Sequence, residues 1–323
     1  MKKRIALLLI LALLMTLAAC QKQETPGGTG DQPEDPAATT TQPSTDPTKP
    51  PITWMTFPAE RQLTAQQYFV FDCERGEFLT ISGSENDRIY PASVTKLFTA
   101  YVANQFLHPD QEITVDTAMD YVYPGSSVAE LKKGDIVTPR QLVEGMLLPS
   151  GNDAAYVLAI AAKGSPEAFV AEMNDQAGLL GMTGSHFANP DGIHEDDHYM
   201  TFHDLAILGM LALEDPIIMA YAATAAETVT IPDSSTVISG GEASAATGST
   251  KEWKNTNALI HKDSEYYCPY AIGLKTGQTP SAGSCLLSAF EYDGTTYIIG
   301  VFGCPEEDDR FADTLQLFNS TIS

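Results

Sequence analysis

The chain has 323 residues, of which 43% are hydrophobic and 19% charged, an ordinary balance for a globular protein. Its 42 acidic and 18 basic residues give a formal net charge of -24. So acidic a surface repels phosphate backbones, and we therefore expect no nucleic-acid partner.

Residues 1–19 have the layout of a secretory signal. Basic residues 2–4 precede an apolar run, 5–17, which is too short to favour a membrane-spanning helix. The run ends in Leu-Ala-Ala before Cys20, and small residues before a Cys resemble the bacterial lipoprotein processing site. We expect cleavage after residue 19 and a lipid on Cys20 that anchors the protein to the membrane outside the cytoplasm. A plain signal peptide with an incidental Cys is the alternative.

A polar segment separates the signal from the rest of the chain. Residues 21–51 are rich in Pro, Thr, Gln and Gly and show no aliphatic periodicity, which is typical of a disordered tether. We therefore assign residues 20–54 to the lipidated Cys and the tether, and residues 55–323 to the folded domain.

Four cysteines lie in the folded part. A location outside the cytoplasm permits disulfides, and four cysteines allow three pairings. Their apolar, strand-like surroundings suit buried thiols, and we favour free thiols. The four residues are Cys73, Cys268, Cys285 and Cys304.

The folded part begins with strands. Residues 67–81 predict a β-hairpin, because β-rich runs flank a Glu-Arg-Gly-Glu turn. After Pro91 the apolar residues between 94 and 106 recur at helical spacing. This helix begins with Ser93-Val94-Thr95-Lys96, which places a hydroxyl and an amine one turn apart on the same face. A neighbouring amine with a lowered pKa can make a serine nucleophilic, but this short motif alone is weak evidence.

The middle of the chain, residues 138–220, is predicted to be mostly helical. Ser165, followed by Pro and Glu, and Thr201, with an Asp three residues later, are typical N-caps. Ser150-Gly151-Asn152 lies between two of the predicted helices.

Residues 194–198 match H-E-x-x-H, the pattern with which a helix of a zinc peptidase holds its metal. A turn signal, Asn-Pro-Asp-Gly at 189–192, immediately precedes the match, and Thr201 caps a helix that starts only after it. The central residues of the match are both Asp, and no third ligand follows, because His203 lies on the later helix. We therefore predict a loop at this position and no metal site.

Strand patterns return after residue 224. A loop of small residues at 233–250 is followed by β-rich runs, and Lys275-Thr276-Gly277 ends one of them. An Asp-Gly pair at 293–294 predicts a hairpin turn, and an amphipathic helix is expected near 307–320. Strands at both ends around a helical middle predict an α+β fold: an antiparallel sheet flanked by helices, with an inserted all-helical lobe.

The three short motifs together occur in penicillin-binding proteins and class A β-lactamases. They are present in the right order, and the chain resembles the D-alanyl-D-alanine carboxypeptidases of the S11 serine peptidase family. The resemblance covers roughly residues 62–320, including "PASVTKLFTAY", "LLPSGNDAA" and "GLKTGQTPSAGSCL". It implies the fold shared by serine β-lactamases and penicillin-binding proteins, and no cofactor.

The resemblance implies a role for each motif residue. Ser93 is the acylated nucleophile and Lys96 its general base. In the second motif, Ser150 relays a proton to the leaving amine and Asn152 orients the substrate amide. Lys275 and Thr276 bind the terminal carboxylate of the substrate, with Arg310 near it. Gly277 allows the substrate backbone to approach closely. The N–H groups of Ser93 and Gln278 form an oxyanion hole.

The implied reaction removes the terminal D-Ala from a peptidoglycan stem pentapeptide, and β-lactams acylate the same serine. Two features depart from the family pattern. The chain ends soon after the catalytic domain, so that we expect no C-terminal β domain and anchoring by the N-terminal lipid. Gln278 stands where an aromatic residue or His often follows K-T-G.

Several alternatives remain open. A class A β-lactamase usually has Asp where this chain has Gly151, and no Glu between residues 150 and 275 is followed four positions later by Asn. A D,D-endopeptidase on the same fold is not separated by sequence. A non-enzymatic lipoprotein that senses β-lactams or muropeptides would need the same Ser and Lys, and a zinc peptidase would lose its activity to a chelator.

Overall fold

A computed structural model describes residues 62–232 and 248–323, which belong to one compact unit, Phe57–Ser323. The predicted signal, Cys20 and the whole tether lie outside the described residues, as does most of the 233–250 loop. The lipid anchor and the domain boundaries therefore stay predictions.

The main sheet is antiparallel and joins the two ends of the folded chain. Its spatial order is β2-β1-β11-β10-β9. The strands are β1 (Gln67–Asp72), β2 (Glu77–Ile81), β9 (Ala271–Thr279), β10 (Gly283–Tyr292) and β11 (Thr295–Cys304). Gln67 of β1 lies opposite Phe302 of β11. The predicted hairpins at 67–81 and around Asp293-Gly294 are confirmed, and both residues of the second turn have positive φ.

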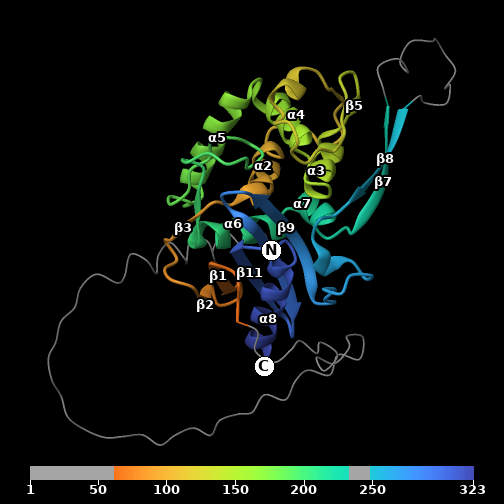
Figure 1. Ribbon diagram of the computed structural model, residues 1–323. Coiled ribbons are helices and arrows are strands. Elements are labelled where there is room, and N and C mark those ends of the chain that lie inside the picture. The colour runs from red at the N-terminus through yellow and green to blue at the C-terminus, as the bar shows by residue number, and fades with distance from the viewer. Residues whose placement is uncertain (1–61, 233–247) are drawn as a thin grey trace, which may run out of the picture. The chain divides into compact units, whose positions relative to one another are not determined.

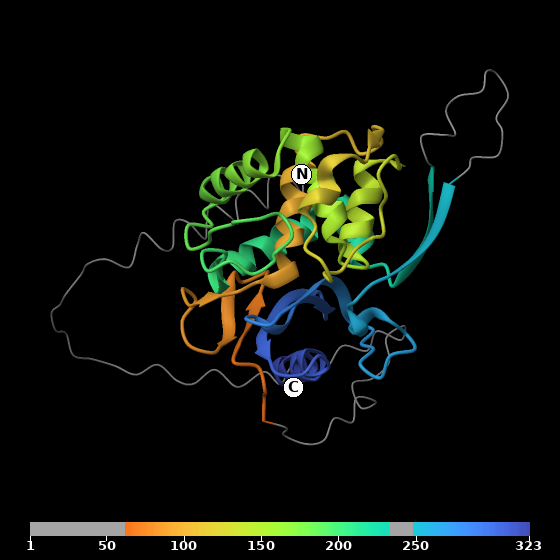
Figure 2. The same cartoon turned by 45° about the horizontal axis from the view of Figure 1, so that its top comes forward.

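Helices cover both faces of this sheet. Phe290 of β10 stacks on Phe318 of α8 (Asp309–Ile322), with ring centroids 4.3 Å apart. The neighbouring residue Ala289 pairs with Ile298, which contacts Gly209 of α6 (Phe202–Glu214). Successive strand residues point to opposite faces, so α8 and α6 cover different sides (Figure 2). Double coverage explains the nearly continuous burial of β10.

The predicted helical lobe is present. It is formed by the part of the chain between strands β2 and β9, and α2 (Thr95–Ala103) lies inside it (Figure 1). Every residue of α2 is buried except Tyr101, which is half-buried. The lobe also contains α3 (Pro139–Leu147), α4 (Asn152–Lys163), α5 (Pro166–Leu179) and α7 (Pro216–Ala222). The predicted N-caps are confirmed, because Ser165 accepts from Ala168 N and Thr201 from Asp204 N.

Short elements complete the described part of the chain. Two-residue strands form the pairs β3 (Arg88–Ile89) with β6 (Met200–Thr201), and β4 (Ile113–Thr114) with β5 (Ile136–Val137). A longer pair projects from the unit as β7 (Ala226–Pro232) and β8 (Gly248–Lys254) (Figure 1). The 3₁₀ turns are η2 (Ala92–Val94), η3 (Thr117–Tyr121) and η5 (Ala258–Ile260). Within the described ranges no single helix is long and apolar enough to cross a membrane; only α6 and α7 taken together reach that length and composition, and they are bent by 95°.

Candidate active site

Ser93 lies in the turn η2, immediately before α2. The structure refines the predicted helix start, because this first turn is 3₁₀ rather than α-helical. Side chains three positions apart lie on the same face of a helical turn, which brings the Ser93 hydroxyl toward the Lys96 amine. Ser93 is half-buried, whereas the residues around it from 91 to 100 are buried, so its side chain stays accessible.

Lys96 is the partner that makes Ser93 chemically distinctive. Its Nζ donates to Ser93 Oγ at 2.8 Å and to the carbonyl oxygen of Asp191 at 2.7 Å. The residue is completely buried, and this burial lowers the pKa of Lys96 to about 8, against the opposing effects of Asp191 and Asp153. With this pKa, about a tenth of the amine is neutral at pH 7 and able to accept the hydroxyl proton, and the fraction rises with pH.

The second motif lies beside α2 at the start of α4. Ser150 has a φ of 63° and connects α3 to α4, and both Ser150 and Asn152 are buried. The adjacent carboxylate, Asp153, accepts from Ala129 N and Leu131 N, and its charge favours the ammonium form of Lys96. Within the described residues, neither Ser150 nor Asn152 hydrogen-bonds Ser93, Lys96 or Lys275 through its side chain, so their relay and orienting roles stay predictions.

Gly151 has a packing reason for lacking the Asp found in β-lactamases. A Cβ at this position would lie 2.7 Å from both Ala129 N and Gly145 O, and Gly151 N already donates to Gly145 O. The tight turn that presents Ser150 therefore excludes a side chain here.

The third motif occupies the end of the edge strand β9. Lys275 Nζ donates to Thr256 Oγ1 at 3.4 Å, to Thr276 O at 3.1 Å and to Thr276 Oγ1 at 3.3 Å. None of its hydrogen-bond partners in the described part of the chain is a carboxylate. Burial, with the charges of Lys96 and Arg310, holds the pKa of Lys275 well below its ordinary value. A bound carboxylate would reverse this effect and favour the ammonium, so the site suits the end of a peptide.

Gly277 brings this strand against the nucleophile turn. A Cβ at Gly277 would lie 2.8 Å from Pro91 O and 3.1 Å from Ser93 N. The close packing of the protein backbone therefore requires Gly here, in addition to the predicted approach of the substrate backbone. Ser93 N is thus close to the strand segment that carries the exposed residue Gln278. This proximity is compatible with the predicted oxyanion hole. Arg310 Nη1 donates to Gly277 O at 3.3 Å, which places this residue beside the third motif; its predicted contact with the substrate carboxylate stays a prediction.

Sequence reasoning missed two contributors to the site. The carbonyl of Asp191 fixes the Lys96 amine, and the Thr256 hydroxyl hydrogen-bonds both Thr276 and Lys275. The turn signal at 189–192 marked the first of these regions, but no residue type pointed to either role.

The loop that carries Asp191 packs directly on the Ser93 turn. Gly192 has a φ of +83°, and a Cβ there would lie 2.0 Å from Ala92 O. We expect Gly192→Ala to displace the loop, lower the rate of serine acylation at least tenfold and destabilise the fold by more than about 3 kcal/mol. Thermal unfolding and labelling with a fluorescent penicillin measure both effects.

Gly164→Ala is the matched control for this prediction. Gly164 has a φ of +84°, but nothing lies within 4 Å of its Cβ position, so only backbone strain of about 1–2 kcal/mol is expected. Equal effects of the two substitutions on acylation would show that the contact with Ala92 is unimportant.

The H-E-x-x-H segment forms the predicted loop. His198 is buried, and both ring nitrogens are engaged: Nδ1 accepts from Ala188 N, which leaves Nε2–H to donate to Thr95 Oγ1 at 2.8 Å. Among the residues that the structure describes, no group of three or more His, Cys, Asp or Glu side chains is arranged to hold a metal. The four cysteines of the described ranges are free, as favoured.

His198 also predicts acid sensitivity. Burial lowers the pKa of His198 from 6.5 to about 3, so its neutral form stabilises the fold fully above pH 6.5 and this contribution is lost as the pH falls toward 3. Between pH 6.5 and 5 the expected loss is about 2 kcal/mol. We expect His198→Gln to remove this part of the pH dependence in urea unfolding, whereas His108→Gln, at an exposed position, retains it. An unchanged pH dependence in His198→Gln would contradict the assignment.

Comparisons with known proteins agree with this geometry. Residues 54–306 match the Peptidase_S11 family model, described as D-alanyl-D-alanine carboxypeptidase. A D-alanyl-D-alanine carboxypeptidase of Streptomyces sp. strain K15 is 36% identical over 237 residues, which cover 70% of this chain and 77% of that protein. DacF of Bacillus subtilis, also a D-alanyl-D-alanine carboxypeptidase, is 29% identical, and the match covers 74% of this chain but only 58% of DacF.

Solved structures show the same fold. The crystal structure of the Streptomyces K15 DD-transpeptidase is similar with a TM-score of 0.71 and 30% identity, over 81% of this chain and 98% of that one. The D-alanyl-D-alanine carboxypeptidase DacD of Francisella tularensis follows with a TM-score of 0.69 and 26% identity, over 83% and 72% of the two chains. The predicted α+β fold is confirmed, and the chain belongs to the Peptidase S11 family of D-alanyl-D-alanine carboxypeptidases.

Proposed function

We propose that this protein is a serine D-Ala-D-Ala carboxypeptidase that removes the terminal D-Ala from peptidoglycan stem pentapeptides. The observation that carries the proposal is the buried Lys96 amine, 2.8 Å from the accessible Ser93 hydroxyl and held by the Asp191 carbonyl. Membership of the S11 family supports the substrate class. Lys275, with no carboxylate hydrogen-bonded to it in the described ranges, supplies the positive charge for the terminal carboxylate.

The first half of the reaction acylates the serine. Neutral Lys96 accepts the hydroxyl proton as Ser93 Oγ attacks the carbonyl carbon of the scissile D-Ala-D-Ala bond. The N–H groups of Ser93 and Gln278 stabilise the oxyanion. The proton then passes through Ser150 to the leaving nitrogen, the C–N bond breaks, and D-Ala departs from Lys275 and Thr276.

The second half regenerates the enzyme. Water attacks the ester carbonyl, Lys96 accepts one of its protons, and the Ser93–acyl bond breaks with return of a proton to Ser93 Oγ. A β-lactam opens on the same oxygen but keeps its leaving nitrogen tethered in the product. β-Lactams are therefore expected to inhibit the enzyme as slowly hydrolysed acyl-enzymes.

Action on peptidoglycan implies a location outside the cytoplasm. We propose that residues 55–323 form the catalytic domain and that a lipid on Cys20, followed by the 20–54 tether, holds it at the membrane. Metabolic labelling with a radioactive fatty acid tests the anchor, because Cys20→Ala removes the only residue to which it would be attached.

The decisive measurement is D-Ala release from an acyl-D-Ala-D-Ala peptide, followed beside mass spectrometry of the penicillin-treated protein. Catalytic release of D-Ala, together with a penicilloyl adduct found on the peptide that contains Ser93, supports the carboxypeptidase. Stoichiometric acylation without D-Ala release would instead indicate a sensor, rapid loss of the adduct a β-lactamase, and cleavage of cross-linked dimers in preference to pentapeptides an endopeptidase.

Acyl transfer to an amine is the second candidate, because a structure 30% identical to this chain is that of a DD-transpeptidase. An amine would then replace water in the second half of the reaction. Adding glycylglycine to the assay and comparing the transfer product with the free acid measures the partition.

A further inference from the structure

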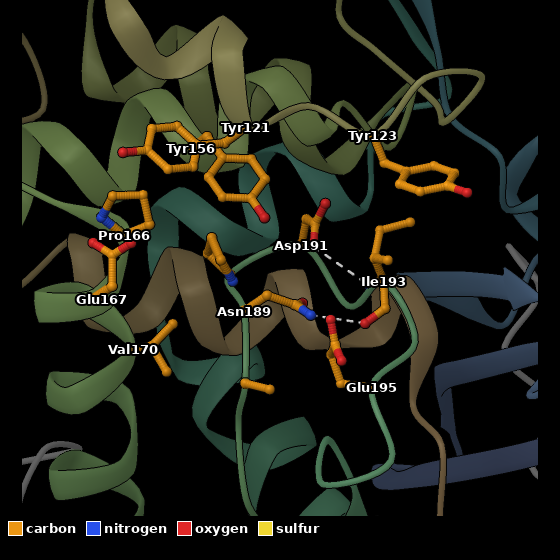
Figure 3. A pocket seen from close by; sticks show the side chains of 12 residues that line it. Tyr121, Tyr123, Tyr156, Pro166, Glu167, Val170, Asn189, Asp191, Ile193 and Glu195 are labelled. Atoms are coloured by element: carbon orange, nitrogen blue, oxygen red, sulfur yellow. Dashed lines mark hydrogen bonds between the residues drawn. The ribbon is translucent and has the colours of Figure 1, made fainter.

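A cavity of about 470 Å³ begins at the residue that positions the Lys96 amine (Figure 3). Asp191 lines this cavity, and its carbonyl accepts from Lys96 Nζ, which in turn donates to Ser93 Oγ. A second, smaller cavity of about 310 Å³ is lined by Thr256, the hydrogen-bond partner of Lys275. In the proposed binding mode the substrate carboxylate binds Lys275, on the side of the smaller cavity, and the larger cavity lies on the Lys96 side.

The larger cavity combines carboxylates with aromatic rings. Tyr121 and Tyr156 stack with centroids 5.6 Å apart, and below these rings in Figure 3 Glu167 lies at the left, beside Pro166, and Glu195 lies near the bottom. Burial raises the pKa of Tyr156, and the charges of Asp191, Glu195 and Glu167, which all line the cavity, raise it further. No Lys or Arg is among the described residues that line it.

Asp191 supplies an independent sign of a missing partner. Only 1% of the residue is exposed, and its Oδ2 has no hydrogen-bond partner in the described part of the chain, whereas Oδ1 accepts from Ile193 N at 3.2 Å. A buried carboxylate oxygen without a donor is costly. Burial raises the pKa of Asp191 and Lys96 opposes that rise, so a further cation would favour the ionised form.

We propose that this cavity, built around Asp191, Glu195, Glu167, Tyr121 and Tyr156, binds the side-chain ammonium of the diamino residue that precedes D-Ala-D-Ala in the stem peptide. The inference rests on the proposed carboxypeptidase function and names its substrate preference. Carboxylates and aromatic faces together recognise an alkylammonium.

The reach of such a substrate is suitable. The diamino residue is one residue away from the acylated D-Ala, about 3.3–3.6 Å of extended chain. A lysine then adds a flexible four-carbon stem that carries its ammonium. The backbone carbonyl of Asp191 is linked to Ser93 through the Lys96 amine alone, so the residue that lines the cavity lies close to the acylated serine.

The same charges select between two sources of the ammonium. A lysine offers the cation alone, whereas diaminopimelate carries a carboxylate on the same terminal carbon. Three carboxylates around one cavity repel that second group. The preferred substrate is therefore a stem peptide with lysine, or with another side-chain ammonium that lacks an adjacent carboxylate.

The test compares D-Ala release from three acyl-D-Ala-D-Ala peptides that differ only in the preceding residue: lysine, Nε-acetyl-lysine and diaminopimelate. We expect kcat/KM for the free lysine to exceed that for the acetylated one by about tenfold, with the diaminopimelate peptide also below free lysine. Equal values for the two lysine peptides, or a higher value for diaminopimelate, would overturn the inference. Release from none of the peptides would instead contradict the proposed function.

Two exposed carboxylates allow the site to be altered without touching the catalytic groups. Glu167→Gln with Glu195→Gln should reduce the preference for the free lysine to about threefold or less and leave kcat/KM for the acetylated peptide unchanged. Asp197→Asn is the matched control, because it removes a charge from the same exposed loop outside the cavity lining. A preference that survives the double substitution, or falls equally in Asp197→Asn, would assign it to the overall negative charge and not to this cavity.

Discussion

Ser93→Ala is expected to abolish D-Ala release, by about 10⁴-fold or more, and to abolish labelling by penicillin at the same time. The substitution removes the hydroxyl that Lys96 activates for acylation, and neither the oxyanion donors nor Lys275 replaces a nucleophile. D-Ala release is measured with a coupled oxidase assay, and acylation by the mass of the intact protein.

The fold should tolerate this change, which separates chemistry from stability. Ser93 is half-buried at the surface of η2, and substitution by Ala deletes one oxygen atom and no packed carbon. Ser84→Ala, at an exposed loop serine, serves as the matched control and should keep full activity. D-Ala release that persists in Ser93→Ala with the wild-type rate would falsify the nucleophile assignment and with it the proposed mechanism.

Local patterns predicted most of the secondary structure because the interactions behind them are local. The caps at Ser165 and Thr201 depend on hydrogen bonds to residues three positions later, and the Asp-Gly turn depends on two backbone conformations. The order of the sheet was beyond such reasoning. The pairing of β1 with β11 joins residues 67 and 302, and nothing in either segment alone specifies the other.

The candidate site likewise contains residues that the sequence predicted and contacts that it could not predict. Ser93, Lys96, Lys275 and Arg310 were predicted by motif and resemblance, since their side chains carry recognisable chemistry. The hydrogen bond from Lys96 to Asp191 was not predictable, because every residue type offers the same backbone carbonyl. Gly151 was noted only as a departure from β-lactamases, and its reason, the lack of space beside Ala129 and Gly145, is a property of the folded turn.

The pH dependence of acylation is the second large effect expected from this site, and it belongs to Lys96. The pKa of Lys96 is lowered to about 8, and only the neutral amine accepts the Ser93 proton. The rate constant for acylation by a penicillin should therefore rise about tenfold per pH unit below 8 and level off above it. Deprotonation of Lys275, whose pKa is also lowered by burial, opposes this rise, because the Lys275 charge binds the carboxylate of the penicillin.

Lys96→Met identifies the group responsible for the rising part of the profile. Methionine retains an unbranched, buried side chain but cannot accept a proton, so we expect acylation to fall by about 10³-fold and to become independent of pH between 6 and 8. Lys262→Met, which removes a lysine charge at an exposed position, should leave both the rate and its pH midpoint unchanged. A midpoint near 8 that persists in Lys96→Met would show that another group accepts the proton. Lys275 would then be the remaining candidate, because it is buried close enough to Lys96 for the two charges to repel each other.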